Sequence, residues 1–258
     1  MTLTPSLSEP QTPPVRLHAL VPCGGSGSRA GAGVPKQYRP VAGQPVLGHT
    51  LAALAGVARL DTVLVVVASD DDTGPRTAHA AWPGHPAGGE GQGPRLVVAG
   101  CAGPSRAHTV FNGLAHLLAQ GASPHDWVLV HDAARCLVTP AQVNALVDAC
   151  LPDAVGGLLA LPLPDTLKAA TPDGRVAATV PRSDKWLAQT PQMFRLGVLQ
   201  RALARAEPRG FDGITDEASA IEALGLSPKL VPGSAENVKL TYPPDFALAQ
   251  AILKGRQA

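Results

Sequence analysis

The chain has 258 residues, of which 45% are hydrophobic and 3% aromatic, and its formal net charge is +1. This length can form one large α/β domain or two small ones, and the nearly neutral charge gives no reason to expect nucleic acid or an anionic membrane as a partner. No run of about 18 apolar residues predicts a membrane span. The four cysteines lack C-x-x-C and zinc-site spacing, which favours reduced thiols in a cytoplasmic protein.

The N-terminal segment, residues 1–15, is rich in proline and lacks the basic and apolar regions of a signal peptide. We interpret it as a flexible tail ahead of a domain that spans 16–258. The apolar run 17–21 then predicts the first buried strand of that domain.

A glycine-rich loop follows this strand and carries two cations, Arg29 and Lys36, in the run LVPCGGSGSRAGAGVPKQY. Glycines lack Cβ, so the backbone can turn tightly and bring its N–H groups close to a ligand. Such N–H donors beside fixed cations suit phosphates. The dinucleotide fingerprint G-x-G-x-x-G and the P-loop both fit incompletely. The loop therefore predicts a phosphate site of another type; the plain alternative is a glycine-rich turn.

Beyond the loop, strand-like and helix-like runs alternate. Helices are predicted over 45–57, 77–82, 109–119, 140–150, 196–205, 215–224 and 243–253. Strands are predicted over 62–68, 96–99, 127–130, 155–161, 229–231 and 237–240, and the chain returns to the domain through 192–194. Thr215 is a suitable N-cap for its helix. Apolar strands that alternate with helices predict a single doubly wound α/β domain, with a mostly parallel sheet covered on both faces.

Polar side chains follow the strand predicted over 127–130. Asp132 and Arg135 belong to the run HDAAR, which begins where this strand ends. Ligands bind beyond the carboxyl ends of strands in open α/β sheets. Right-handed crossovers would place this run and the glycine-rich loop at the same edge of the sheet. For Asp132, the simpler alternative is a helix cap.

Residues 162–185 break the alternating pattern. The segment is polar, and Pro172-Asp173-Gly174 is a good signal for a hairpin turn. It is too polar to belong to the core, so we expect a β-arm that projects from the domain. Because an isolated two-stranded ribbon is marginally stable, we expect the arm to pair with the same arm of a second chain in a homodimer.

Several runs together resemble one family, the cytidylyltransferases that act on 2-C-methyl-D-erythritol 4-phosphate in non-mevalonate isoprenoid biosynthesis. The matching runs are VPCGGSGSRAGAGVPKQY, VHDAAR, DTLK, TPQMF, TDEAS and ENVKLT, in the order of the family. The resemblance implies a nucleotidyltransferase fold with a dimerisation arm. It also implies transfer of CMP from CTP to the sugar phosphate, with release of pyrophosphate.

The resemblance also implies roles for individual residues. Arg29 and Lys36 match cations that stabilise the transition state, and Lys239 matches a lysine that positions the methylerythritol phosphate. Arg182, on the arm, matches an arginine that reaches the neighbouring subunit's site. The positions matching residues around the sugar phosphate are Asp132, Arg135, Thr166 and Thr215. The positions matching residues around CTP are Cys23, Gly24, Gly25, Gly103 and Thr109.

The implied chemistry is attack by a phosphate oxygen on the α-phosphorus of CTP. Positioning and charge stabilisation dominate such reactions, and a phosphate nucleophile is already ionised near pH 7, so it needs no general base. We expect Mg²⁺ on the CTP phosphates, with Asp132 as the nearest candidate carboxylate. No metal ligand is assigned directly.

The sequence departs from the family pattern at three positions. Pro104 replaces a usual acidic residue near the cytosine, Cys136 replaces a common proline, and Thr109 replaces a serine but keeps the hydroxyl. Alternative functions are cytidylyl transfer to another polyol phosphate such as ribitol 5-phosphate, a dinucleotide-dependent oxidoreductase that would use 70–72 as its ribose-binding acids, and a non-catalytic nucleotide-binding module.

Overall fold

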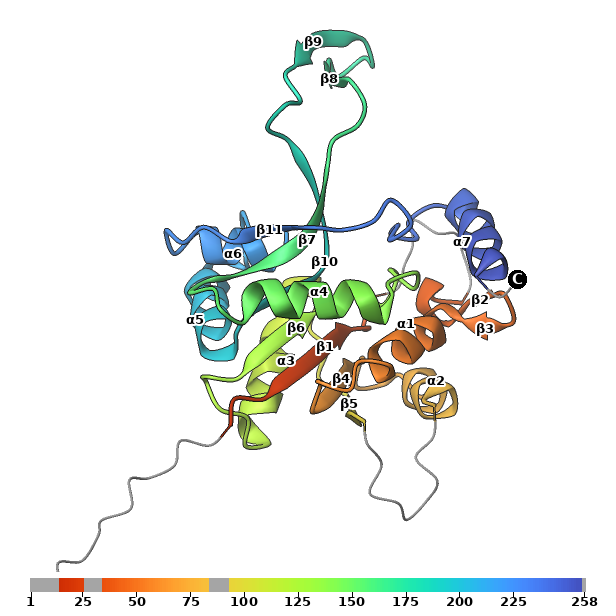
Figure 1. Ribbon diagram of the computed structural model, residues 1–258, viewed down its shortest axis with the longest axis vertical. Coiled ribbons are helices and arrows are strands. Elements are labelled where there is room, and N and C mark those ends of the chain that lie inside the picture. The colour runs from red at the N-terminus through yellow and green to blue at the C-terminus, as the bar shows by residue number, and fades with distance from the viewer. Residues whose placement is uncertain (1–13, 26–33, 84–92, 257–258) are drawn as a thin grey trace, which may run out of the picture.

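A computed structural model describes residues 14–25, 34–83 and 93–256. At its centre lies a seven-stranded sheet in the order β11-β7-β10-β6-β1-β4-β5 (Figure 1). These strands are β1 (Leu17–Pro22), β4 (Thr62–Val66), β5 (Arg95–Ala99), β6 (Trp127–Val130), β7 (Gly156–Pro162), β10 (Trp186–Arg195) and β11 (Lys229–Pro232). β10 is antiparallel to both of its neighbours, whereas the other neighbouring pairs of this sheet are parallel. The prediction of a mostly parallel sheet is confirmed.

Helices cover both faces of the sheet. One face packs against α1 (Val46–Ala55), α2 (Thr73–Ala81) and α4 (Pro140–Cys150). The other packs against α3 (Arg106–Ala119), α5 (Leu196–Ala206) and α6 (Glu217–Glu222). Within β1, Ala19 and Val21 belong to the first core and Leu20 to the second. Burial on both faces is why the inner strands read as continuous apolar runs.

The remaining elements are short or peripheral. A 3-10 turn, η2 (Lys36–Tyr38), follows the glycine-rich loop, and β2 (Pro40–Val41) pairs with β3 (Gln44–Pro45). A second 3-10 turn, η3 (Glu207–Arg209), follows α5, and α7 (Pro243–Gly255) closes the chain beside β2. No helix among the described residues is both long enough and apolar enough to cross a membrane. All four cysteines are free.

Strand β1 determines where a ligand can bind. It is hydrogen-bonded in parallel to β4 on one side and β6 on the other. From β1 the chain passes to β4 and β5 on one side. It then returns and adds β6 next to β1 on the opposite side. The loops after β1 and β6 therefore leave the same edge side by side, at the kind of switch point where α/β sheets bind ligands.

The polar segment forms the predicted arm. Strands β8 (Leu167–Ala170) and β9 (Val176–Val180) pair with each other and project away from the domain (Figure 1). Their turn contains Gly174 at φ 80°, a conformation that favours glycine. The projecting arm is confirmed, and its role in dimerisation stays a prediction.

Residues 237–240 do not form the predicted strand. They follow an irregular path and form single hydrogen bonds to other segments in place of a strand ladder. Asn237 donates from Nδ2 to the carbonyl of Thr190 at 2.9 Å, and the N–H of Leu240 donates to Ala134 O at 2.9 Å. The segment is thereby joined to the loop after β6.

Three helix starts also differ from the prediction. α2 begins at Thr73 and α3 at Arg106, each a turn or so earlier than expected. In α3 the cap is Ser105, whose side chain accepts the N–H of His108. In α6 the cap is Asp216, which shares a capping box with Ser219. Thr215 is therefore not the N-cap.

Candidate active site

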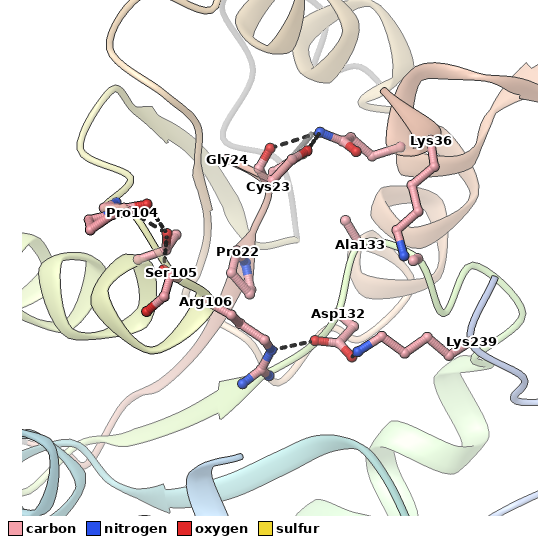
Figure 2. Close-up of a pocket in the computed structure, with 15 residues that line it drawn as sticks. Pro22, Cys23, Gly24, Lys36, Pro104, Ser105, Arg106, Asp132, Ala133 and Lys239 are labelled. Carbon is pink, nitrogen blue, oxygen red and sulfur yellow. Dashed lines mark hydrogen bonds and ion pairs between the residues drawn. The ribbon is translucent and has the colours of Figure 1, made fainter. Parts of the chain in front are cut away.

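A pocket of about 270 Å³ opens at the carboxyl edge of β1 and β6 (Figure 2). Three chain segments and one lysine form its walls: the start of the glycine-rich loop with η2, the loop and first turn of α3, the loop after β6, and Lys239. The predicted residues Cys23, Gly24, Gly25, Lys36, Gly103, Thr109, Asp132 and Lys239 all line it. Residues from distant parts of the chain therefore line one pocket, as expected for a shared site, and their individual roles stay predictions. Arg29 lies outside the described residues.

The glycine-rich wall is fixed by Gln37. Its Nε2 donates to the carbonyls of Cys23 and Gly25 at 3.0 and 2.9 Å. The neighbouring Lys36 donates from Nζ to Leu240 O at 2.9 Å. Gln37 therefore binds η2 to the loop, and Lys36 reaches across the pocket to the segment that carries Lys239.

Cys23 contributes its backbone rather than its thiol. The side chain is buried, and its Sγ donates to the hydroxyl of Tyr38 at 3.8 Å. Burial raises the pKa of this thiol to about 12, so it stays protonated at neutral pH. The hydroxyl of Tyr38 donates in turn to Asp71, which also accepts the N–H groups of Thr73 and Gly74 at the start of α2.

This role of Asp71 bears on the oxidoreductase alternative. That alternative needs an acidic residue after the second strand to bind a ribose. Asp71 instead bonds Tyr38 through one oxygen and caps α2 through the other. Of the three acids at 70–72 that favoured a dinucleotide site, Asp71 is thus engaged in structural contacts.

The opposite wall holds the residues predicted to surround the nucleotide base. The N–H of Gly103 donates to Oγ1 of Thr109 at 3.2 Å, and Oγ1 donates to Ser105 O at 2.9 Å. A Cβ at Gly103 would lie 2.4 Å from that of His108, so this close turn requires glycine. Pro104 lines the pocket beside them and offers no N–H.

Asp132 is the charged centre of the pocket. Its Oδ1 accepts from Arg106 Nε at 2.7 Å, and its Oδ2 lies 2.7 Å from Lys239 Nζ (Figure 2). Burial alone would raise the pKa of Asp132, but the charges of Arg106 and Lys239 hold it well below the usual range. Asp132 is therefore a fixed anion that orients two cations.

The sequence did not point to Arg106 or to its second partner, Glu217. Arg106 donates to both carboxylate oxygens of Glu217, at 2.7 and 3.0 Å. A signal was present: an arginine in the first turn of a helix faces the positive end of the helix dipole and needs compensating anions. That signal is visible only once the helix is known to begin at Arg106, with Ser105 as its N-cap.

A buried polar layer supports the loop that carries Asp132. The hydroxyl of Thr190 accepts the N–H of Asp132 at 3.0 Å and lies 3.1 Å from Nδ1 of His131. Nε2 of His131 lies 3.2 Å from Arg135 O, which assigns the ring proton to Nε2. Burial lowers the pKa of His131 to about 4, so the ring is neutral near pH 7.

Four predicted substrate residues lie elsewhere in this chain. Arg135 donates to Asn237 O at 2.7 Å and Ala188 O at 3.2 Å, and so holds the segment before Lys239 instead of lining the pocket. Thr166 and Arg182 are exposed on the arm. Thr215 lines an adjacent cavity of about 250 Å³, which shares Ser105 and Arg106 with the first. Sequence spacing could not place these four because Thr166 and Arg182 depend on the arm, Thr215 on the start of α6, and Arg135 on contacts with segments distant in sequence.

Comparisons with known proteins agree with this geometry. Residues 17–255 match the profile of a family described as IspD, 2-C-methyl-D-erythritol 4-phosphate cytidylyltransferase. A bifunctional enzyme IspD/IspF from Albidiferax ferrireducens is 56% identical over 259 residues, covering all of this chain and 58% of the relative's length. A 2-C-methyl-D-erythritol 4-phosphate cytidylyltransferase from Paraburkholderia phymatum is 51% identical, covering 94% of this chain and 98% of the relative.

Solved structures show the same fold. A 4-diphosphocytidyl-2C-methyl-D-erythritol synthase superposes with a TM-score of 0.78 at 38% identity, covering 94% of this chain and all of that one. A 2-C-methyl-D-erythritol 4-phosphate cytidylyltransferase from Thermus thermophilus has a TM-score of 0.65 at 30% identity, covering 92% of this chain and 98% of that one.

Proposed function

The chain belongs to the family of 2-C-methyl-D-erythritol 4-phosphate cytidylyltransferases, and we propose that the pocket around Asp132 is its active site. The enzyme transfers a cytidylyl group from CTP to 2-C-methyl-D-erythritol 4-phosphate and releases pyrophosphate. The relatives matched over nearly their whole length carry this name, which favours methylerythritol phosphate over ribitol 5-phosphate.

The observation that carries the site assignment is that two lysines meet at one short segment, residues 239–240. Lys239 pairs with Asp132, while Lys36 bonds the carbonyl of the next residue, Leu240. This arrangement brings two cations to the pocket from opposite ends of the chain. Both line the same pocket as Gly24 and Gly25, at the start of the glycine-rich loop, and the N–H groups of such a loop suit a triphosphate.

In the mechanism that we propose, the protein positions and neutralises charge. The sugar phosphate attacks the α-phosphorus of CTP through one of its ionised oxygens, and the bond to the pyrophosphate oxygen breaks in line. Lys36, together with Arg29 of the same loop, stabilises the charge that develops on the α-phosphate oxygens. Lys239, oriented by Asp132, holds the attacking phosphate. No protein group has to remove a proton, because the nucleophile is already an anion.

Mg²⁺ fits this pocket as an ion carried by the nucleotide. Among the described residues no three histidine, cysteine or acidic side chains form a metal cage. Asp132 already uses both oxygens on Arg106 and Lys239. Mg²⁺ commonly keeps several waters and binds through substrate phosphates, and when bound it would neutralise negative charge on the nucleotide. Lys36 and Lys239, which line the pocket, would supply the protein's own positive charge beside such an ion-bearing nucleotide.

We also propose a cytoplasmic homodimer. Arg182 is exposed on the projecting arm and is not among the residues that line the pocket of its own chain, so we assign a phosphate-binding role of this arginine to the site of a second subunit. Trp186 and Leu187, at the base of the arm, are 39% and 47% exposed, which supports burial of this region against a partner chain. Four free cysteines support a reducing compartment.

One assay tests the proposed function. Purified protein with Mg²⁺, CTP and 2-C-methyl-D-erythritol 4-phosphate should release pyrophosphate and form the cytidine diphosphate adduct. Ribitol 5-phosphate in place of the methylerythritol compound should react at least about 10²-fold more slowly, since a site built to bond a substrate's polar groups rejects poor matches strongly. Equal rates with both would contradict the substrate assignment, and no release with either would contradict the function.

A further inference from the structure

We infer that Arg106 is a positioning residue, which holds Asp132 so that the second carboxylate oxygen grips Lys239, and that Glu217 holds Arg106 for this task. The inference rests on the proposed function, because it concerns the lysine assigned to the attacking phosphate. Neither Arg106 nor Glu217 is among the residues to which the family resemblance assigned a role.

The first argument is the cost of placing an arginine where Arg106 lies. It is the first residue of α3, at the positive end of the helix dipole, where a cation is disfavoured. Its side chain is only 28% exposed. Burial lowers the pKa of an arginine, but Glu217 and Asp132 outweigh that effect and raise the pKa of Arg106 above its usual value. Two carboxylates are needed to keep this cation in place.

The second argument is the shape of the contact. Nε of Arg106 donates to Asp132, while Nη1 and Nη2 donate to the two oxygens of Glu217. The planar guanidinium group thus donates hydrogen bonds to two carboxylates in two different directions. The single ammonium group of a lysine cannot reproduce this arrangement. The orientation of Asp132 is thereby fixed by geometry as well as by charge.

The third argument is that Glu217 is itself anchored. Its side chain is 2% exposed, and it begins α6. The start of α6 is bound to β10 by Gln192, which donates from Nε2 to Asp216 at 2.9 Å and accepts the N–H of Ala218 at 2.8 Å. Glu217 therefore connects Arg106 to a central strand. A continuous series of contacts runs from β10 through Glu217, Arg106 and Asp132 to Lys239.

This series of contacts predicts a specific kinetic defect when Arg106 is replaced. Arg106 contacts Asp132 and Glu217 (Figure 2 shows its approach to Asp132), whereas CTP is assigned to the walls at Gly25 and Gly103. Arg106→Lys should lower kcat by about 10²-fold, the typical effect of a misplacement of about 1 Å in a reacting group. KM for CTP should change by less than about threefold, since the nucleotide wall keeps its own hydrogen bonds.

The kinetic experiment uses matched variants. Arg106→Lys is compared with Arg205→Lys, an exposed arginine of α5, which should match wild type. Glu217→Gln keeps the size of the side chain and an acceptor oxygen but removes the charge. It should also reduce kcat, by a smaller factor than Arg106→Lys does. Thermal unfolding of each variant, compared with wild type, checks that the variant is folded. Unchanged kcat in Arg106→Lys, or a change in KM for CTP alone, would overturn the inference.

A double-mutant cycle tests whether Arg106 acts through Lys239. Lys239→Ala should lower kcat, and adding Arg106→Lys to it should reduce kcat by less than about threefold more, because the group being positioned is already gone. A full additional loss of about 10²-fold would mean that Arg106 acts by another route and would overturn the inference.

A structural readout separates this inference from the proposed function. In a crystal structure of the Arg106→Lys protein, we expect Asp132 Oδ2 to move beyond hydrogen-bond distance of Lys239 Nζ, from the present 2.7 Å. An unchanged contact would overturn the positioning role even if the protein proved to have a different activity. Conversely, wild-type protein without pyrophosphate release would contradict the proposed function, while a displaced Asp132 would still support the role of Arg106.

Discussion

Asp132 Oδ2 and Lys239 Nζ lie 2.7 Å apart, although one follows β6 and the other precedes α7. The second oxygen of Asp132 is bonded to Arg106. Because burial excludes water from this carboxylate, the ion pair is less screened than a surface pair. Lys239 is consequently oriented before either substrate arrives, which lowers the reorganisation required at the moment of reaction.

Replacing Asp132 should therefore affect catalysis more than binding of CTP. Asp132→Asn keeps the size of the side chain but removes the charge that holds two cations, and we expect kcat to fall by about 10²-fold. Steady-state kinetics with both substrates checks this. Asp148→Asn is the matched control. Asp148 lies on α4 and forms an exposed ion pair with Arg59, so this substitution should leave kcat unchanged. An active Asp132→Asn enzyme would show that the orientation of Lys239 is not limiting.

Lys36 should act mainly in the transition state. Lys36 lines the pocket and its ammonium is held at Leu240 O, and a preorganised charge of this kind is typically worth about 10²–10³ in rate. Lys36→Ala should lower kcat by that factor, and the same result is expected for Arg29→Ala. If either variant altered only KM, its cation would bind ground and transition states equally, contrary to the assigned role.

The buried His131 should make stability fall in mild acid. Burial lowers its pKa from 6.5 to about 4, so between these values the unfolded chain binds a proton that the folded chain does not. Stability is then complete above about pH 6.5 and declines as the pH falls towards 4. The shift corresponds to on the order of 3 kcal/mol. Urea unfolding of wild type at pH 7 and pH 5 measures the decline.

His131→Asn tests whether this histidine is the cause. The amide can still face Thr190 but does not titrate in this range, so the loss of stability between pH 7 and pH 5 should be smaller than in wild type. His79→Asn, at an exposed position of α2, should leave the wild-type pH dependence intact. An equal decline in His131→Asn and wild type would assign the effect to other groups.

Most of the fold was predictable because its inner strands are continuous apolar runs and its helices carry regular apolar spacing. The strand predicted over 237–240 was wrong. Its alternating apolar residues resemble a strand, but Asn237 bonds Thr190 O, a contact between residues far apart in sequence. In the site, the glycine-rich loop and Asp132 were found because each follows a strand. Arg106 was missed because its helix was expected to begin at Thr109, which left the arginine in an apparent loop.

The preference for CTP tests the effect of Pro104. The wall at Gly103 and Thr109 already forms its own hydrogen bonds, and Pro104 supplies neither a carboxylate nor an N–H to the base. We nevertheless expect kcat/KM for CTP to exceed that for UTP by at least about 10²-fold, because groups paired with cytosine are left unpaired by uracil. Comparable values for the two nucleotides would identify Pro104 as the cause of lost discrimination, and Pro104→Asp should then restore it.

Sharing of the active site between subunits is the most demanding prediction. Arg182 is exposed on an arm that projects from the domain, whereas Lys36 and Asp132 line the pocket. The exposed edges of β8 and β9 can be covered by the same ribbon of a second chain, which gives a two-fold contact. That contact would bring Arg182 to the partner's pocket, where its fork can bind a phosphate through two parallel hydrogen bonds.

Subunit complementation distinguishes a shared site from a self-contained one. Arg182→Ala and Lys36→Ala proteins should each be inactive, and mixing them under conditions of subunit exchange should restore activity. A mixed dimer then has one site with both lesions and one with neither, so its activity should approach half that of wild type. Mixing Lys36→Ala with Lys239→Ala is the control: both residues line the pocket of a single chain, so each site of that mixed dimer keeps one lesion and stays inactive. Recovery in the first mixture alone requires that Arg182 cross to its partner. If exchange is demonstrated and neither mixture recovers, Arg182 acts in its own subunit or has no part in the reaction.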